Sequence, residues 1–184
     1  MNRGTLALAI AFSAGLLACS GGAHNNGTSN TSCGTCPAGL ANWAEWPIPN
    51  SQVDVTAGAP NLESYTDNGD GTVTDNVTGL MWQQVVPATR YAGADAVAYC
   101  PTLTLAGHSD WRLPSVIELS SIVDLGQSDR SINPTYFPST PSFFFWSASP
   151  LAGSSSVVWL VEFYRGAAYY GAIASNDANV RCVR

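Results

Sequence analysis

The chain has 184 residues, of which 46% are hydrophobic, 10% are aromatic and only 11% are charged, and its formal net charge is −6 at pH 7. This length suits one domain with a tail, and the apolar content can supply a core. All seven basic residues are arginines. An acidic chain without a basic patch repels phosphate backbones, so nucleic acid is not an expected partner.

The N-terminus has the pattern of an export signal. Arg3 precedes the apolar run TLALAIAFSAGLL, which is too short for a spanning helix. The following LLACS resembles the lipobox of bacterial lipoproteins, in which Cys19 would be lipidated. Residues 1–18 would then be the signal peptide, the lipid would anchor the chain to a membrane, and Ser20 favours the outer membrane of a Gram-negative cell envelope. The alternative is an ordinary secretory signal with an incidental cysteine.

A polar tether is predicted over residues 19–42, which are rich in Gly, Ser, Asn and Thr and too poor in apolar residues to fold. Apart from the lipobox cysteine, four cysteines remain, which suits two disulfides in an oxidising compartment. Cys33 and Cys36 form CGTC in the tether, where a local disulfide is favoured over a redox motif. Cys100 and Cys182 are then left to pair with each other.

The folded domain is expected over residues 43–184. Short β-like runs from residue 64 onward are separated by NGDG and NVTG, which favour tight turns. A helix is predicted over residues 92–100, and Pro101 should end it. Its apolar residues share one face: Ala94, Val97 and Ala98.

A second helix of about three turns is predicted to begin after Ser115, with Glu118 completing a capping box and Gly126 ending it. The last third contains the strand-like runs FFFWSAS, SVVWLVEFY, AAYYGAI and NVRCVR. Both faces of residues 157–161 are apolar, so this strand should be central. Hairpins, two helices and an antiparallel meander together predict an α+β domain.

Five segments carry a family resemblance: YTDNGDGTVTDNVTGLMWQ, AVAYC, DWRLPSVIEL, FWSAS and VRCVR. In this order they resemble the Lcl C-terminal domain family, named from the Legionella collagen-like protein, over residues 43–184. The resemblance implies a fold of the C-type lectin-like group, in which a disulfide ties the first helix to the last strand. Cys100 and Cys182 would form this tie, and closing so long a loop should stabilise the domain by about 4–5 kcal/mol.

Four residues of these segments are expected to have structural roles. Trp82 should enter the core, and Trp111 should pack inward. Glu118 should cap its helix, and Arg112 should pair with a neighbouring acid such as Asp110.

The segment YTDNGDGTVTDNVTGLMW contains weak calcium candidates, Asp67 and Asp70. Their spacing does not match an EF-hand loop, and the glycines suit turns, so hairpins are favoured over a calcium site. His24 and His108 have no ligand partners nearby in the sequence. No metal or other cofactor is therefore expected.

A speculative ligand site lies in the last third. Aromatic residues with an arginine can stack on sugars or anchor proteins, although strand packing is the alternative. The usual calcium-dependent sugar motifs of lectins, EPN and WND, are missing from the sequence. The candidate ligand-binding residues are Tyr164, Arg165, Tyr169, Tyr170, Asn176 and Asp177.

These features predict a lipid-anchored, surface-exposed, non-enzymatic recognition or adhesion module that binds an extracellular or periplasmic glycan or protein. Two alternatives remain: a cell-envelope enzyme with an unidentified carboxylate site, and a structural lipoprotein that oligomerises. No catalytic residue is assigned, because no GxSxG is present and carboxylates paired in space leave no sequence signal. The resemblance would suggest sulfated glycans as ligands, but the net charge of −6 argues against them.

Overall fold

A computed structural model describes residues 49–174 and 177–184, and the structural statements below concern these residues. The predicted signal peptide and tether lie outside the described residues. So do the predicted lipidation site Cys19, the predicted Cys33–Cys36 disulfide and the ligand candidate Asn176.

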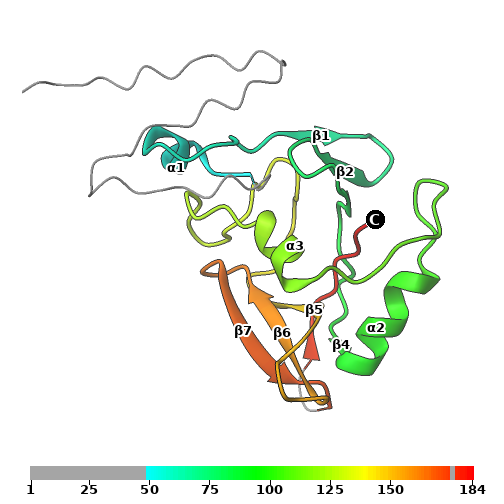
Figure 1. The fold of residues 1–184 in the computed structure, drawn as a ribbon. Helices are drawn as coiled ribbons and strands as arrows, with labels where there is room; N and C mark the ends of the chain where they lie inside the picture. The colour runs from blue at the N-terminus through cyan, green and yellow to red at the C-terminus, as the bar shows by residue number, and fades with distance from the viewer. Residues whose placement is uncertain (1–48, 175–176) are drawn as a thin grey trace, which may run out of the picture. The chain divides into compact units, whose positions relative to one another are not determined.

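The described part of the chain forms a mixed α+β domain, as the sequence predicts (Figure 1). Its helices and strands are, in chain order, α1 Gln52–Thr56, β1 Tyr65–Asp67, β2 Thr72–Asp75, β3 Met81–Gln83, β4 Tyr91–Ala92, α2 Gly93–Thr102, α3 Val116–Ser121, β5 Phe144–Pro150, β6 Val157–Glu162, β7 Ala167–Ala172 and β8 Asp177–Ala178.

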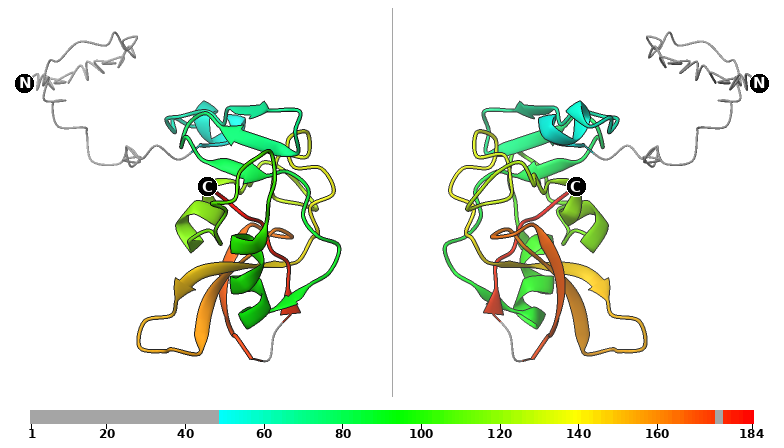
Figure 2. Two further views of the ribbon diagram at one scale, coloured as in Figure 1. Left: turned by 90° about the vertical axis from the view of Figure 1, so that its right-hand side faces the viewer. Right: turned by 90° about the vertical axis from the view of Figure 1, so that its left-hand side faces the viewer.

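The strands form small antiparallel sheets in the orders β1-β2-β3, β4-β8 and β5-β6-β7. The β1–β2 hairpin lies at one end of the domain and the β5–β7 meander at the other, with α3 between them (Figure 2). β6 is the central strand of the meander, which confirms the prediction for residues 157–161. The predicted hairpins around NGDG and NVTG are also confirmed.

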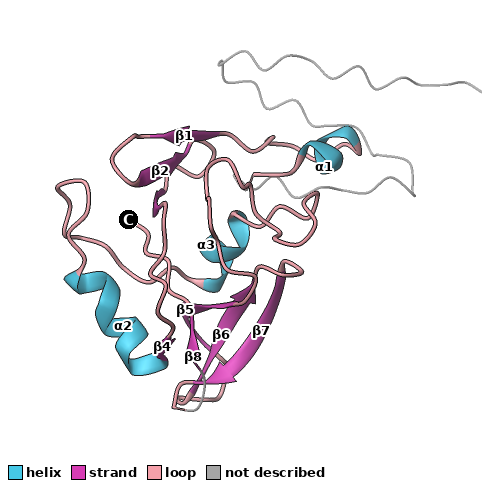
Figure 3. Cartoon of the chain, turned by 180° about the vertical axis from the view of Figure 1, so that it is seen from behind, coloured by secondary structure: helices cyan, strands magenta, loops and turns pink. Residues whose placement is uncertain are grey.

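The β5-β6-β7 sheet separates two hydrophobic clusters. On one face, Trp146 and Leu160 are cross-strand partners and pack with the buried side of α2. On the other face, Phe145 and Val161 pack with Leu119 of α3. Successive side chains of a strand point to opposite faces, so one meander serves both clusters. Figure 3 shows α2 and α3 as separate elements beside this sheet.

A disulfide joins Cys100 in α2 to Cys182 near the C-terminus, across a sequence separation of 82 residues, and both cysteines are fully buried. The predicted pairing is confirmed. However, Cys182 lies beyond the last strand, β8, in a segment that pairs through isolated bridges. Val183 bridges both Trp82 and Arg112, so this segment lies between β3 and the chain that leads to α3.

The predicted core face of α2 is wrong. Val97 is 59% exposed, whereas the buried residues of the helix are Gly93, Ala96 and Cys100. Both sets have helical spacing, so periodicity alone does not separate them. The disulfide and the close approach of Ile173 to Gly93, where a Cβ would lie 2.5 Å from a methyl group, hold the second set inward. Pro101 lies in the last turn of α2 instead of just after it.

Helix α3 is shorter than predicted and ends at Ser121, before Gly126. The chain leaves the helix because the Asp124 backbone N–H donates to the Ser131 carbonyl at 3.0 Å, which folds it into the following loop. Leu119 and Ile122, three positions apart, are both buried in the core. The short helix α1 was not predicted, although its N-cap Ser51, which accepts a hydrogen bond from the Asp54 N–H, is a recognisable signal.

Candidate functional site

A surface pocket of about 190 Å³, which we call the aromatic hollow, lies where β6, β7 and β8 meet the start of β5. It is lined by Phe143, Phe144, Leu160, Tyr169, Tyr170, Gly171, Asp177 and Ala178. The antiparallel meander aligns Tyr169 with Leu160, so these two residues face the hollow from neighbouring strands. Four short segments between residues 143 and 178 therefore contribute to one pocket.

The rings of the hollow are arranged edge to face. The Phe143 and Phe144 ring centroids lie 5.2 Å apart, and the Phe144 and Tyr169 centroids lie 5.4 Å apart with an interplanar angle of 90°. Such contacts are a favourable aromatic geometry, so the rings hold one another in place. Tyr169 is 38% exposed, whereas the ring of its neighbour Tyr170 packs on Trp159 on the opposite face of the sheet, with centroids 6.1 Å apart. The hollow thus presents rigid aromatic surface to the solvent.

Opposite charges flank these rings. The Arg90 guanidinium lies 4.6 Å from the centroid of the Phe143 ring, within cation–π range. Asp177 lines the hollow, and its side chain is exposed. A guanidinium only donates hydrogen bonds and an ionised carboxylate only accepts them. Asp177 is the charged residue among those that line the hollow, whereas Arg90 covers the Phe143 ring and is not one of them.

The structure brings together some of the predicted ligand residues. Tyr169, Tyr170 and Asp177 line the hollow. Tyr164 and Arg165 instead lie in the turn before β7, where the Arg165 guanidinium is 5.5 Å from the Tyr164 ring centroid. β8 follows the opposite end of β7, so the turn is a separate surface. Whether either surface binds a ligand stays a prediction.

Sequence reasoning missed Arg90 and the contributions of Phe143, Phe144 and Leu160. The run FFFWSAS gave a signal for the two phenylalanines, because exposed aromatic residues often mark binding surfaces. It did not show which ring points outward. Arg90 gave no signal, since it lies more than fifty residues before the Phe143 ring that it covers.

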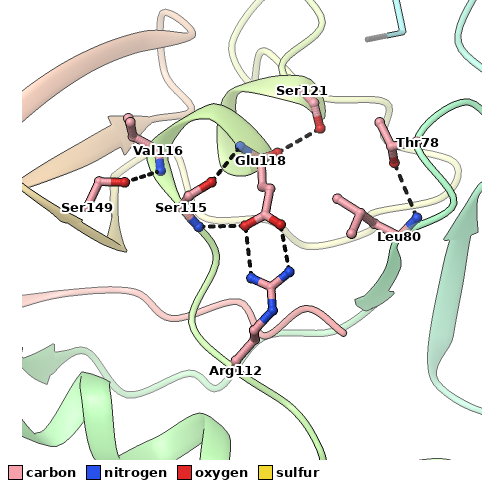
Figure 4. Close-up of polar contacts among 8 residues, drawn as sticks. All are labelled: Thr78, Leu80, Arg112, Ser115, Val116, Glu118, Ser121 and Ser149. Carbon is pink, nitrogen blue, oxygen red and sulfur yellow. Dashed lines mark hydrogen bonds and ion pairs between the residues drawn. The ribbon is translucent and has the colours of Figure 1, made fainter. Parts of the chain in front are cut away.

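A cluster of polar side chains at the start of α3 has a structural role (Figure 4). Arg112 donates two hydrogen bonds to the carboxylate of Glu118, at 2.9 and 2.6 Å. The Ser115 backbone N–H donates to Glu118 Oε2 at 2.8 Å, and the Glu118 N–H donates to Ser115 Oγ at 3.2 Å. The predicted capping box is thus present, and the Arg112 guanidinium fixes its carboxylate.

The predicted Arg112–Asp110 pair is wrong. Asp110 pairs with Arg184, whose Nε lies 2.8 Å from Oδ1. Arg112 is directed to α3 because the capping-box geometry places the Glu118 carboxylate beside it. Trp82 and Trp111 are buried as predicted.

The Arg112–Glu118 contact predicts acid sensitivity. Hydrogen bonds from Arg112, with smaller help from Ser115, lower the pKa of Glu118 from 4.5 to about 2. Because the folded-state pKa is depressed, the stabilisation is complete above about pH 5 and is lost as the pH falls to about 2. Glu118→Gln should lower the free energy of unfolding at pH 7 by about 1–2 kcal/mol, since solvent screens this half-exposed pair. It should also flatten the pH dependence of urea midpoints between pH 5 and 2. An unchanged pH profile would contradict this assignment.

The acidic segment forms turns in which the carboxylates bind backbone and side-chain donors. The Gly69 N–H donates to Asp67 Oδ1 at 2.9 Å, and Gln84 Nε2 donates to Asp67 Oδ2 at 3.0 Å. The Thr72 N–H and hydroxyl both donate to Asp70 Oδ1, at 3.1 and 2.6 Å. Short polar side chains often stabilise turns in this way.

We expect no tight calcium binding at Asp67 and Asp70. Their oxygens already accept local hydrogen bonds, and the spacing does not supply an alternating ligand set. No group of three His, Cys, Asp or Glu residues suited to a metal ion occurs among the described residues. Isothermal titration with calcium should show no heat beyond dilution, and a saturable micromolar binding curve would overturn the expectation.

Gly71→Val should destabilise the first hairpin. Gly71 has a φ of +89°, a region that β-branched residues strongly avoid. A Cβ at this position would also lie 3.3 Å from a methyl carbon of Leu105. We expect the free energy of unfolding to fall by about 1–3 kcal/mol, measured by chemical denaturation. Gly71→Ala should cost less than Gly71→Val, and equal costs would contradict the role of β-branching.

In the part of the chain that the structure describes, no helix has the length and apolar character needed to cross a membrane. No curated protein matches the chain in a sequence comparison. The family model of the Lcl C-terminal domain matches residues 71–184. This range begins in the first β-turn and contains the disulfide, the capping box and every residue of the aromatic hollow. The match covers more than half of the 184 residues, and the chain therefore belongs to the Lcl C-terminal domain family.

Proposed function

We propose that this protein is a non-enzymatic recognition module that binds an extracellular or periplasmic glycan or protein through the aromatic hollow. The observation that carries the proposal is the convergence of Phe143, Phe144 and Tyr169 with Asp177 at one exposed pocket. Exposed aromatic side chains are costly to leave in water unless they serve contact, and they dominate binding energies at interfaces.

The N-terminal sequence supports a location of this module at a membrane. The lipobox-like LLACS would anchor the chain by acyl groups on Cys19, and the polar tether would separate the domain from the membrane. We propose that the domain is displayed in this way on the outer membrane of a Gram-negative cell. The α2-to-C-terminus disulfide and the antiparallel meander support our assignment of the domain to the C-type lectin-like group.

We prefer a binding function over a catalytic one because of the number of carboxylates at the surface pockets. The hollow contains one carboxylate, that of Asp177. A second pocket, of about 230 Å³ between residues 127 and 137, also contains one, that of Asp129. Glycoside hydrolysis usually needs two carboxylates on either side of one bond. A hollow with a single exposed carboxylate beside aromatic rings is better suited to holding a ligand than to cleaving it.

The test is a binding survey with the full chain, purified in detergent under oxidising conditions. A glycan array and a panel of immobilised extracellular-matrix proteins are the probes. We expect saturable binding to at least one probe, and we expect it to persist in EDTA because no calcium site takes part. Failure to bind any probe, with and without calcium, would contradict the proposed function.

A structural role is a second candidate, favoured by β7. This strand lies at the edge of its sheet, and its sequence AAYYGA contains neither a charge nor a proline. Charges and prolines are the usual protection of an edge strand against pairing with another chain. If β7 pairs with a second copy, light scattering after size exclusion should give the mass of a dimer, whereas a monomer at millimolar concentration would dismiss this role.

A further inference from the structure

We infer that two copies of this chain pair through the outer edge of β7, in antiparallel orientation and centred on Tyr169. The two three-stranded meanders then form one continuous sheet, and the partner's Tyr169 stands beside the aromatic hollow. This inference rests on the second candidate role described above. It goes beyond that role because it assigns the register of the contact and connects the contact to the hollow.

The backbone groups of β7 that point away from β6 belong to Ala168 and Tyr170. The Ile173 N–H donates to the Ser156 carbonyl at 2.9 Å, and this pair continues the β6–β7 register. Hydrogen-bonded and non-hydrogen-bonded pairs alternate along an antiparallel ladder, so Tyr169 bonds to β6 and its two neighbours do not. Among the described residues, no other hydrogen bond uses the outward groups of Ala168 or Tyr170. Both residues are exposed, so this edge is open.

This open edge is complementary to itself. β7 is the outer strand of its sheet (Figure 1). When each copy supplies the outward groups of Ala168 and Tyr170, Ala168 lies opposite the partner's Tyr170 and Tyr169 lies opposite the partner's Tyr169. The small Ala168 leaves room for the partner's Tyr170 ring, while the two Tyr169 rings form an aromatic cross-strand pair, which is favourable. A two-fold axis between these rings relates the copies, so the assembly closes as a dimer.

The charges around β7 also fit a second copy. The strand itself carries no charge, so two acidic chains can meet there without like charges in contact. Arg165 lies in the turn before β7, and Asp177 lies in β8, which follows the other end. Antiparallel pairing brings the start of one β7 beside the end of the other, so opposite charges approach at both ends of the contact. This complementarity favours a second copy over an unrelated peptide strand.

The pairing adds a residue to the aromatic hollow. Directly opposed residues of a non-hydrogen-bonded pair point to the same face, with Cα atoms about 4.5 Å apart. Tyr169 lines the hollow, and its ring centroid lies 5.4 Å from that of Phe144. The partner's Tyr169 therefore stands at the rim of the same hollow. Both hollows open to one side of the joined sheet, so a ligand with repeated binding groups can engage both copies.

A scan with single cysteines tests the register. The variants are Ala168→Cys, Tyr169→Cys and Tyr170→Cys, each made in the full chain and oxidised with diamide in detergent. In the assigned register the two copies of position 169 are directly opposed, whereas those of position 168 or 170 are diagonal neighbours about 7–8 Å apart. Because a disulfide does not span more than about 7 Å between Cα atoms, we expect at least about fivefold more linked dimer from Tyr169→Cys than from the other two.

Non-reducing electrophoresis measures the linked dimer, and the unaltered chain is the control for linkage through Cys33 or Cys36. Stronger linkage through position 168 or 170 would overturn the assigned register. Equal linkage at all three positions would indicate random collisions and would overturn the inference, as would linkage no greater than that of the unaltered chain.

Ala168→Pro tests the contact without a cysteine. Proline lacks the outward N–H and is tolerated on an edge strand where that group faces the solvent, so we expect an unchanged urea midpoint. So short a contact buries less area than the about 1,200 Å² of a stable interface, so the dimer should form at about millimolar concentration. Light scattering of the full chain in detergent should then give a dimer for the unaltered protein and for the control Ala168→Ser, and a monomer for Ala168→Pro.

The outcomes separate this inference from the functions proposed above. A dimer that persists in Ala168→Pro would overturn the β7 contact, while a structural role through another surface would stand. A monomer of the unaltered chain would overturn both the inference and the structural role. Neither result bears on recognition through the hollow of a single copy, which the binding survey tests independently.

Discussion

Replacing Cys100 and Cys182 together with alanine is expected to lower the free energy of unfolding by about 4–5 kcal/mol. The disulfide closes a loop with a sequence separation of 82 residues, and in the chain-entropy model its removal restores that much freedom to the unfolded chain. A domain of this size is stable by about 5–15 kcal/mol, so the variant should be close to unfolded at 37 °C. Urea denaturation, monitored by tryptophan fluorescence, measures the change.

The tether cysteines provide the matched control for this experiment. Cys33 and Cys36 are separated by only two residues in the sequence, so a bond between them closes a very short loop. Replacing both with alanine should leave the urea midpoint of the domain unchanged. If the Cys33/Cys36 variant loses as much stability as the Cys100/Cys182 variant, the disulfide between α2 and the C-terminal segment is not the main covalent constraint on the fold.

Arg181→Ala should cause the second large effect, a loss of about 2–4 kcal/mol. Arg181 is fully buried, and its guanidinium lies 4.7 Å from the centroid of the Phe137 ring. It donates to the Thr140 hydroxyl at 2.7 Å and to the Gln83 carbonyl at 3.4 Å. Truncation would leave a cavity and remove the donor from Thr140. Thermal unfolding of the variant gives the size of the loss.

Arg181→Met separates packing from charge. Burial lowers the pKa of Arg181 to about 9, so the side chain is still charged at pH 7. Among the described residues no carboxylate pairs with it, and its Nε has no hydrogen-bond partner. Methionine fills a similar space without a buried charge, so this variant should be clearly more stable than Arg181→Ala. Equal losses would show that the hydrogen bonds to Thr140 and Gln83 contribute more than packing.

The local signals in the sequence predicted the elements that depend on local chemistry. The capping box of Ser115 and Glu118 and the glycine turns around Gly71 are formed by residues a few positions apart, and the structure contains both. The central position of β6 followed from its two apolar faces. The Cys100–Cys182 pair could be predicted from the sequence because only a few cysteines could be combined.

The wrong predictions concern features that are determined by residues far away in the sequence. The face of α2 was wrong because alanines at helical spacing occur on both sides, and Cys182 and Ile173 select the buried one. The partner of Arg112 was wrong because Arg184, more than seventy residues away from Asp110, takes that acid. The buried Arg181 was not predicted, since an arginine in an extended terminal segment is usually exposed.

The candidate site was only partly visible for the same reason. Tyr169, Tyr170 and Asp177 are close in sequence and were proposed together, and they do line one hollow. Tyr164 and Arg165 are equally close in sequence but lie beyond the other end of β7. The two sets are separated because they lie toward opposite ends of β7, and the sequence alone does not show where this strand begins and ends. Phe144 of the hollow belongs to β5 and Phe143 lies just before it, and the register of β5 with β6 is fixed only in the folded sheet.

The most direct test of the central claim, that the aromatic hollow is the recognition site, is a titration of the protein with ¹³C-labelled tyrosine rings, followed by nuclear magnetic resonance. Any ligand found in the binding survey serves as the titrant, and Tyr→Phe variants assign the signals. The ring signal of Tyr169 should shift on binding, while those of the buried Tyr65, of Tyr164 in the turn and of Tyr170, which packs on Trp159, should not. An unchanged signal of Tyr169 at saturation, or a shift of Tyr164 alone, would contradict the account.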